Sequence, residues 1–186
     1  MKTTYEISVA GIKRELELFP VSDSLKIAAF ILFGDVELTV KCAEALLKIA
    51  PKYDIMITAE AKSIPLIHEM ARQSGENEYV IARKGVKVYM KNPLEVSVNS
   101  ITTQHEQKLY IGEKEVNMLK GKKVLIVDDV ISTGESLAAI EELVKKAGGE
   151  IAGKLAVLAE GDAIERKDIS VLGQLPLFDA NGEVLA

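Results

Sequence analysis

The sequence has no tryptophan, a single cysteine, five prolines and only 5% aromatic residues in 186 positions. One cysteine excludes an internal disulfide and is typical of the reducing cytoplasm, so a cytoplasmic protein is expected. The longest apolar runs, such as Ile27–Gly34, are too short to cross a bilayer. The first residues lack the apolar block of a signal peptide. We therefore expect no membrane partner.

An excess of positive charge is also missing, because 23 Lys and Arg face 28 Asp and Glu and the net charge is −5. Proteins that coat nucleic acids are usually basic, so no nucleic-acid partner is expected and phosphate recognition must be local. Apolar residues make up 48% of the chain, which is enough for the core of one ordinary domain. Cys42 falls on an expected helix and is interpreted as a buried small hydrophobe.

Hydrophobic periodicity predicts strands that alternate with helices through the middle of the chain. Strands are expected at 4–9, 12–19, 55–59, 79–82, 94–102, 108–112, 123–127, 151–159 and 171–172. Helices are expected at 36–49, 65–73 and 135–147, the first of them capped by Asp35. The first two strands form a hairpin across Ala10-Gly11. The alternation predicts an α/β fold with a parallel sheet covered on both faces.

The most informative segment is Val124–Ser136, with the sequence VLIVDDVISTGES. An apolar strand delivers Asp128 and Asp129 at its carboxyl end, where open α/β sheets bind ligands. A small polar turn then leads into a helix, whose unpaired amides and dipole favour a phosphate. The predicted phosphate-binding residues are Ser132, Thr133, Gly134, Glu135 and Ser136.

The two adjacent acids have a different role from the loop, because like charges do not share one phosphate. They suit vicinal hydroxyls, a bound Mg²⁺, or both. A sugar phosphate with a diol, a 5′-phosphate and a pyrophosphate meets all of these demands. A buried strand that ends in a capping acid is the plainer alternative, common for one Asp but rare for the whole pattern. A Walker A loop is excluded, because its Gly-Lys-[Ser/Thr] is absent.

This segment resembles the motif that binds 5-phosphoribosyl-1-pyrophosphate (PRPP) in the type I phosphoribosyltransferase family. Residues 35–160 are similar to its purine branch, particularly to adenine and also to xanthine phosphoribosyltransferases. The resemblance implies a central, mainly parallel sheet flanked by helices, with a flexible β-hairpin hood. It further implies a single domain, in which 1–34 form an N-terminal hairpin and base-covering segment, 35–160 the PRPP-binding core and 161–186 a C-terminal segment.

Two further segments resemble pyrophosphate-binding elements of the family. In Glu60-Ala61-Lys62-Ser63, Lys62 stands where adenine enzymes have Arg and Ser63 where they have Gly. Lys keeps the charge but loses the fork geometry of Arg. Arg83 and Lys87 match the adenine-branch spacing of basic residues that neutralise pyrophosphate. Taken alone, Lys62 and this basic cluster also read as solvated surface charges.

Ser97–Lys108 resembles the catalytic hood of the family, which closes over PRPP and excludes water. Glu106 aligns with an acidic loop residue of the adenine branch, whereas His105 is interpreted as exposed and His68 as structural. In the family, a base nitrogen attacks C1′ as pyrophosphate leaves, helped by Mg²⁺ and cationic side chains. The resemblance therefore implies Asp128, Asp129 and Glu106 as catalytic residues. It implies Mg²⁺ as cofactor, held through PRPP, with the two Asp as candidate ligands.

The purine base is the least specified part of the prediction. Hypoxanthine-guanine enzymes carry an acid at the position of Ser132, which argues against 6-oxopurines, and a xanthine relative has a polar amide near Leu32. Adenine is therefore favoured, with xanthine as the alternative. Phe30 and Phe33 are candidates to stack on the base, and either fits the core equally well.

The leading hypothesis is thus a purine-salvage enzyme, expected as a homodimer because the family commonly dimerises. Two rivals stay open, since a fold does not fix a function. A PRPP sensor of the purine-repressor type would need an N-terminal DNA-binding domain and a basic surface. A nucleotide-binding module without turnover would follow if Lys62 and Ser63 disable the pyrophosphate loop.

Overall fold

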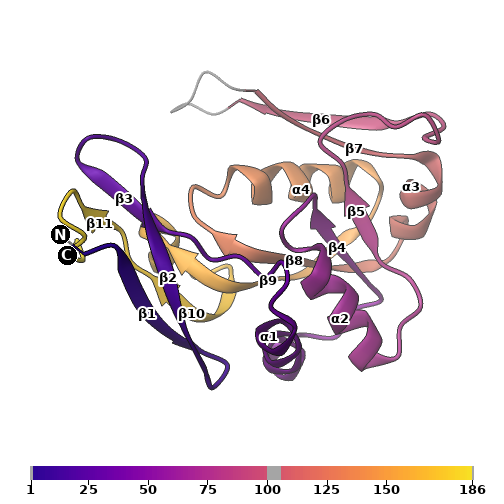
Figure 1. Cartoon of the computed structure of the whole chain (residues 1–186). Coiled ribbons are helices and arrows are strands. Elements are labelled where there is room, and N and C mark those ends of the chain that lie inside the picture. Colours follow the sequence, from indigo (N-terminus) through magenta and orange to yellow (C-terminus); the bar gives the residue numbers. More distant parts are fainter. Residues whose placement is uncertain (1, 100–105, 186) are drawn as a thin grey trace.

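The computed structural model describes residues 2–99 and 106–185, and of 98–99 and 106–107 the backbone alone. A five-stranded sheet forms its centre (Figure 1). Every neighbouring pair in this sheet is parallel, as the sequence predicted. The order is β10 (Ser170–Leu175), β9 (Glu150–Glu160), β8 (Lys123–Ile131), β4 (Ile55–Ala59) and β5 (Val80–Ala82).

Helices cover both faces of this sheet, which explains why β8 is a continuous apolar run. Leu125 and Val127 pack in the cluster beneath α1 (Val36–Ile49) and α2 (Ile64–Ser74). Val124 and Ile126 point the other way, into the cluster under α4 (Glu135–Lys146). Cys42 on α1 is fully buried, as expected. No helix among the described residues is long and apolar enough to cross a membrane.

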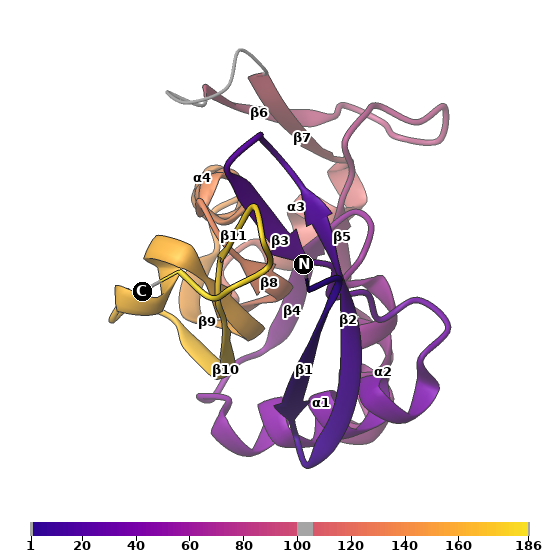
Figure 2. The same ribbon diagram turned by 60° about the vertical axis from the view of Figure 1, so that its left-hand side comes forward.

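A second, antiparallel sheet stands beside the core, with the order β1-β2-β3-β11 (Figures 1 and 2). The hairpin of β1 (Thr4–Val9) and β2 (Ile12–Pro20) is confirmed. The structure adds β3 (Leu25–Ala28) and β11 (Phe178–Asp179), which return the end of the chain to its beginning. Strands this short carry too few residues for a period-two pattern, so the sequence did not reveal them.

The third sheet is the hairpin of β6 (Leu94–Asn99) and β7 (Glu106–Ile111), which packs on α4. It was predicted, but residues 100–105 lie outside the described part of the chain. One face of the hairpin is buried, because Val96 and Leu109 are each 1% exposed, whereas Glu95 and Ser97 on the other face are exposed. The short helix α3 (Glu113–Leu119) follows and was not predicted. The hairpin lies above α4 in both views (Figures 1 and 2).

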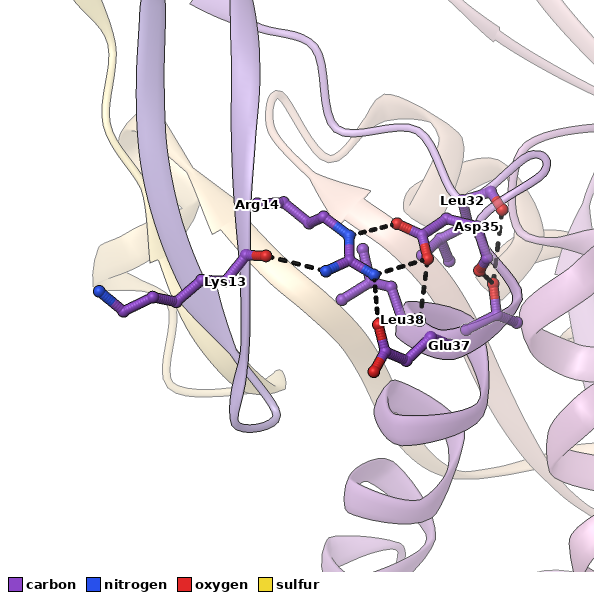
Figure 3. Close-up of polar contacts among 7 residues, drawn as sticks. Lys13, Arg14, Leu32, Asp35, Glu37 and Leu38 are labelled. Carbon is purple, nitrogen blue, oxygen red and sulfur yellow. Dashed lines mark hydrogen bonds and ion pairs between the residues drawn. The ribbon is translucent and has the colours of Figure 1, made fainter.

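One ion-pair cluster joins the N-terminal sheet to the core (Figure 3). Arg14 on β2 donates to Asp35 through Nε at 2.7 Å and Nη2 at 3.0 Å. Its Nη2 also donates to Glu37 at 2.8 Å. The Asp35 carboxylate in turn accepts the Leu38 amide at 3.0 Å, which confirms Asp35 as the cap of α1. We call Arg14, Asp35 and Glu37 the sheet–core latch.

Candidate active site

The candidate site lies where β4 and β8 end. These strands are parallel neighbours, so the residues that follow them meet at one edge of the sheet. β8 runs to Ile131, so Asp128 and Asp129 lie within the strand, near its end. The sequence had suggested a strand at 123–127, with both acids just after it. Asp128 is half-buried and Asp129 is 2% exposed. Ser63, at the start of α2, lies against both acids.

Ser63 and Lys62 contact the acid pair directly. The Ser63 hydroxyl lies 2.7 Å from Asp128 Oδ1 and 3.1 Å from Asp129 Oδ1, and it accepts the Asp129 amide at 2.8 Å. Lys62 Nζ lies 2.7 Å from Asp129 Oδ2, so Lys62 is more than a solvated surface lysine. The peptide bond between Glu60 and Ala61 just before them is cis.

The ionisation of Asp128 is affected by its surroundings. Burial of the Asp128 carboxyl, together with the neighbouring charge of Asp129, raises the pKa of Asp128 above its ordinary value. The hydrogen bond from Ser63 opposes this shift, because it stabilises the ionised form. Asp128 thus lies near the C-terminal end of the central strand β8, where ligands of open α/β sheets bind.

The turn between β8 and α4 contains the residues that the sequence predicts to bind a phosphate. Gly134 occupies the cap position of α4 with φ of +79°, a backbone conformation that favours glycine. A small cavity of about 60 Å³ lies here, walled by Asp128, Ser132, Thr133, Gly134 and Ser136 together with apolar neighbours. Four of the five predicted phosphate-loop residues thus surround one cavity with one acid.

Glu135, the fifth of those residues, does not line the cavity and is half-buried at the first position of α4. Its backbone amide is one of those at the N-terminus of α4. Its side chain places a negative charge near the helix N-terminus, where the dipole is favourable.

The basic cluster of Arg83 and Lys87 lies beside the loop Glu60-Ala61-Lys62-Ser63. Arg83 Nε donates to Glu60 Oε2 at 2.8 Å, and its Nη1 donates to the Tyr89 hydroxyl at 2.7 Å. The Arg83 guanidinium lowers the pKa of Glu60, and the charge of Lys87 contributes. The backbone of Arg83 also pairs with Tyr110 of β7 in both directions at 2.8 Å. Arg83 therefore ties the hairpin to the loop that holds Lys62.

Comparison with known proteins identifies this arrangement. A family model described as "Phosphoribosyl transferase domain" matches residues 37–178. The chain belongs to the phosphoribosyltransferase family. A hypoxanthine/guanine phosphoribosyltransferase of Methanocaldococcus sp. (strain FS406-22) is 35% identical over 147 residues, which is 78% of this chain and 68% of the relative. One of Methanococcus maripaludis (strain C6) is 30% identical over 174 residues, or 90% and 87% of the two chains.

Solved structures confirm the type I phosphoribosyltransferase fold. An adenine phosphoribosyltransferase from Saccharomyces cerevisiae superposes with a TM-score of 0.68 at 22% identity, covering 85% of this chain and 92% of that one. The enzyme of the same name from Thermoanaerobacter pseudethanolicus gives a TM-score of 0.64 at 21% identity, with 92% and 95% covered. At this level of identity the likeness concerns the fold alone.

The phosphoribosyltransferase has two side chains near the site that the sequence did not suggest. Glu160 ends β9 beside β8, and its burial raises its pKa while the charge of Lys62 opposes the shift. Glu160 could have been located from the sequence, because it directly follows the predicted strand 151–159 and the carboxyl ends of parallel strands lie at the same edge of the sheet. Arg166 reaches the phosphate loop, where a Cβ on Gly134 would lie 2.5 Å from its Nη1. Its placement depends on the turn 161–165, which has no periodic signal.

The remaining candidate residues are not brought to the cavity of the phosphate loop. Phe30 is 3% exposed and belongs to the main core cluster, whereas Phe33 is 53% exposed. Neither residue lines that cavity, so their contact with the base stays a prediction. The backbone of Glu106 begins β7, but its side chain lies outside the described part of the chain. His68 is exposed on α2, near the Tyr79 hydroxyl at 3.3 Å.

Proposed function

We propose that this phosphoribosyltransferase transfers the 5-phosphoribosyl group of PRPP to a purine base in purine salvage. The products would be a nucleoside 5′-monophosphate and pyrophosphate. The observation that carries the proposal is the meeting of three elements at the ends of β4 and β8. These are a phosphate loop, an acid pair and the Lys62-Ser63 loop. PRPP offers a matching 5′-phosphate, diol and pyrophosphate.

Each element would bind one part of the substrate. The amides of 132–136, at the N-terminus of α4, would bind the 5′-phosphate. Asp128 and Asp129 would serve the ribose hydroxyls, and Lys62 with Arg83 and Lys87 would face the pyrophosphate. A base nitrogen attacks C1′ as the bond from C1′ to the pyrophosphate oxygen breaks. The cationic side chains would stabilise the charge that develops on the leaving pyrophosphate.

Magnesium fits this site through the substrate and not through a protein cage. Within the residues that the structure describes, no group of three or more His, Cys, Asp or Glu could hold a metal ion. Mg²⁺ prefers octahedral oxygen coordination and is commonly held by one or two carboxylates with substrate phosphates. We infer that Asp128 would be the protein ligand, since Asp129 is buried against Lys62. Bound Mg²⁺ would supply positive charge to the leaving group.

Adenine is the proposed base. Ser132, which has no acidic group, stands where the hypoxanthine-guanine enzymes that the loop resembles carry an acid. The relatives named hypoxanthine/guanine phosphoribosyltransferase support hypoxanthine and guanine as the second candidates. We also propose a cytoplasmic homodimer. Neighbouring exposed apolar side chains at Ile31 (51%), Phe33 (53%) and Val36 (74%) support an interface.

The experiment is a panel of adenine, hypoxanthine, guanine and xanthine with PRPP and Mg²⁺, read as pyrophosphate release. We expect kcat/KM for adenine to exceed the others by about tenfold or more, the scale at which binding pockets discriminate. A Ser132→Asp variant should lower the ratio of kcat/KM for adenine to kcat/KM for hypoxanthine. Faster reaction with hypoxanthine or guanine would overturn the choice of adenine. No pyrophosphate release with any of the bases, together with PRPP-dependent DNA binding, would favour the sensor.

A further inference from the structure

Ser63 uses its hydroxyl in an unusual way for its position. It occupies the cap position of α2, where Ser usually accepts a hydrogen bond from an amide of the first turn. The Ser63 side chain makes no such capping bond and turns instead toward the end of β8. The residue is 1% exposed. The favourable capping bond is thus replaced by contacts with the acid pair.

Those contacts place one hydroxyl between two carboxylates. Ser63 Oγ has a single hydrogen and lies nearer to Asp128 Oδ1, at 2.7 Å, than to Asp129 Oδ1, at 3.1 Å. It accepts the Asp129 amide at 2.8 Å, and the same amide donates to Asp128 Oδ1 at 2.9 Å. One Asp128 oxygen is therefore fixed by two donors. Its rotation is restricted, and the repulsion between the acids is partly offset.

The two acids face different surroundings as a result. Asp129 is 2% exposed and its Oδ2 lies 2.7 Å from Lys62 Nζ. Asp128 lines the cavity of the phosphate loop, and Asp129 does not. Consecutive residues of one loop thus serve the two acids separately, Lys62 for Asp129 and Ser63 mainly for Asp128.

We propose that Ser63 is a positioning residue that fixes Asp128 as the acceptor for a ribose hydroxyl of PRPP. Asp129, paired with Lys62, is then the buried anchor of the pair. The inference rests on the proposed binding of PRPP. It assigns unequal roles to two acids that look equivalent in the sequence.

The test is the affinity of Ser63→Ala for PRPP with Mg²⁺, measured by titration calorimetry. We expect a Kd about tenfold higher than that of the wild type, since a hydrogen bond to a charged group is lost. The KM for the base should stay within about twofold, because the loss is confined to the PRPP side. Ser74→Ala is the matched control, since its hydroxyl bonds Met70 O at 2.9 Å at the far end of α2. It should leave the Kd unchanged.

A double-mutant cycle separates positioning from general stability. If Ser63 acts through Asp128, Ser63→Ala should add less than about twofold to the Kd of Asp128→Asn. Ser63→Thr keeps the hydroxyl and should bind PRPP better than the Ala variant. Ser63→Gly replaces the Ala variant if that one does not fold. The inference would be overturned by a Kd of Ser63→Ala within twofold of the wild type. It would also be overturned if the losses of affinity from Ser63→Ala and Asp128→Asn were fully additive. A wild type that binds no PRPP would overturn the proposed function first.

Discussion

At the scale of single residues, the burial of Asp128 and the neighbouring charge of Asp129 disfavour the ionised form of its carboxyl. Its pKa is raised by burial and by Asp129, so the folded chain holds the proton to a higher pH than the unfolded chain does. Stability is therefore greatest below the unfolded pKa and falls as the pH rises toward the folded value. Functional carboxyls often carry such a penalty.

Asp128→Asn should remove that penalty while keeping an oxygen for Ser63 and the Asp129 amide. We expect the melting temperature at pH 8 to rise by about 2–4 °C, equivalent to about 1 kcal/mol for a chain of this size. The gain should shrink toward pH 4, because the wild-type acid is then largely protonated when folded. Thermal unfolding at both pH values checks this. An equal change at both would show that the charge is not responsible.

At the scale of elements, the phosphate loop depends on Gly134 for two reasons. Its φ of +79° is strained for a residue with a side chain, and an added Cβ would lie 2.5 Å from Arg166 Nη1. Gly134→Ala should therefore shift the loop and raise the KM for PRPP by about tenfold, as small misplacements do. Steady-state kinetics with varied PRPP measures this.

Gly75→Ala is the matched control for the loop. Gly75 has φ of +76°, and an added Cβ there would have no neighbouring atom within 4 Å. It should lose similar stability, about 1–2 kcal/mol, and leave the KM unchanged. If both variants raised the KM equally, backbone strain anywhere in the chain would be enough, and the loop would have no special role.

Elements with long or strongly patterned sequences were predictable. α1 was located with its cap, because Asp35 precedes an amphipathic run, and the apolar β8 required a sheet covered on both faces. The parallel pairing of β4 with β8 brings the Lys62 loop and Asp128 to the same edge of the sheet. The bonds of Ser63 could not be foreseen, because a Ser at a helix start ordinarily caps the helix. β3 and β11 were missed because strands this short carry too few residues for a period-two pattern.

At the scale of the whole molecule, the N-terminal sheet shares the main hydrophobic cluster with α1 and α2, and the sheet–core latch joins it to the start of α1 as well (Figure 3). The Arg14 guanidinium holds the pKa of Asp35 below its usual range. A fork geometry lets Arg14 serve Asp35 and Glu37 at once, which a lysine does not reproduce. The latch therefore helps to fix the angle at which the N-terminal sheet meets the start of α1.

Arg14→Met should loosen that attachment while keeping a side chain of similar length. The resemblance to the family implies that residues 1–34 cover the base, and under the proposed function the core binds PRPP. The KM for adenine should therefore rise by about three- to tenfold, and the KM for PRPP should stay unchanged, as expected when only one substrate's binding is affected. Lys13→Met is the control, since Lys13 pairs with exposed Glu6 at 2.9 Å, within the N-terminal hairpin. Added salt should mimic Arg14→Met in part, because the latch is partly exposed and ions screen it. A parallel rise in both KM values would mean that the latch supports the whole fold and not the placement of the base.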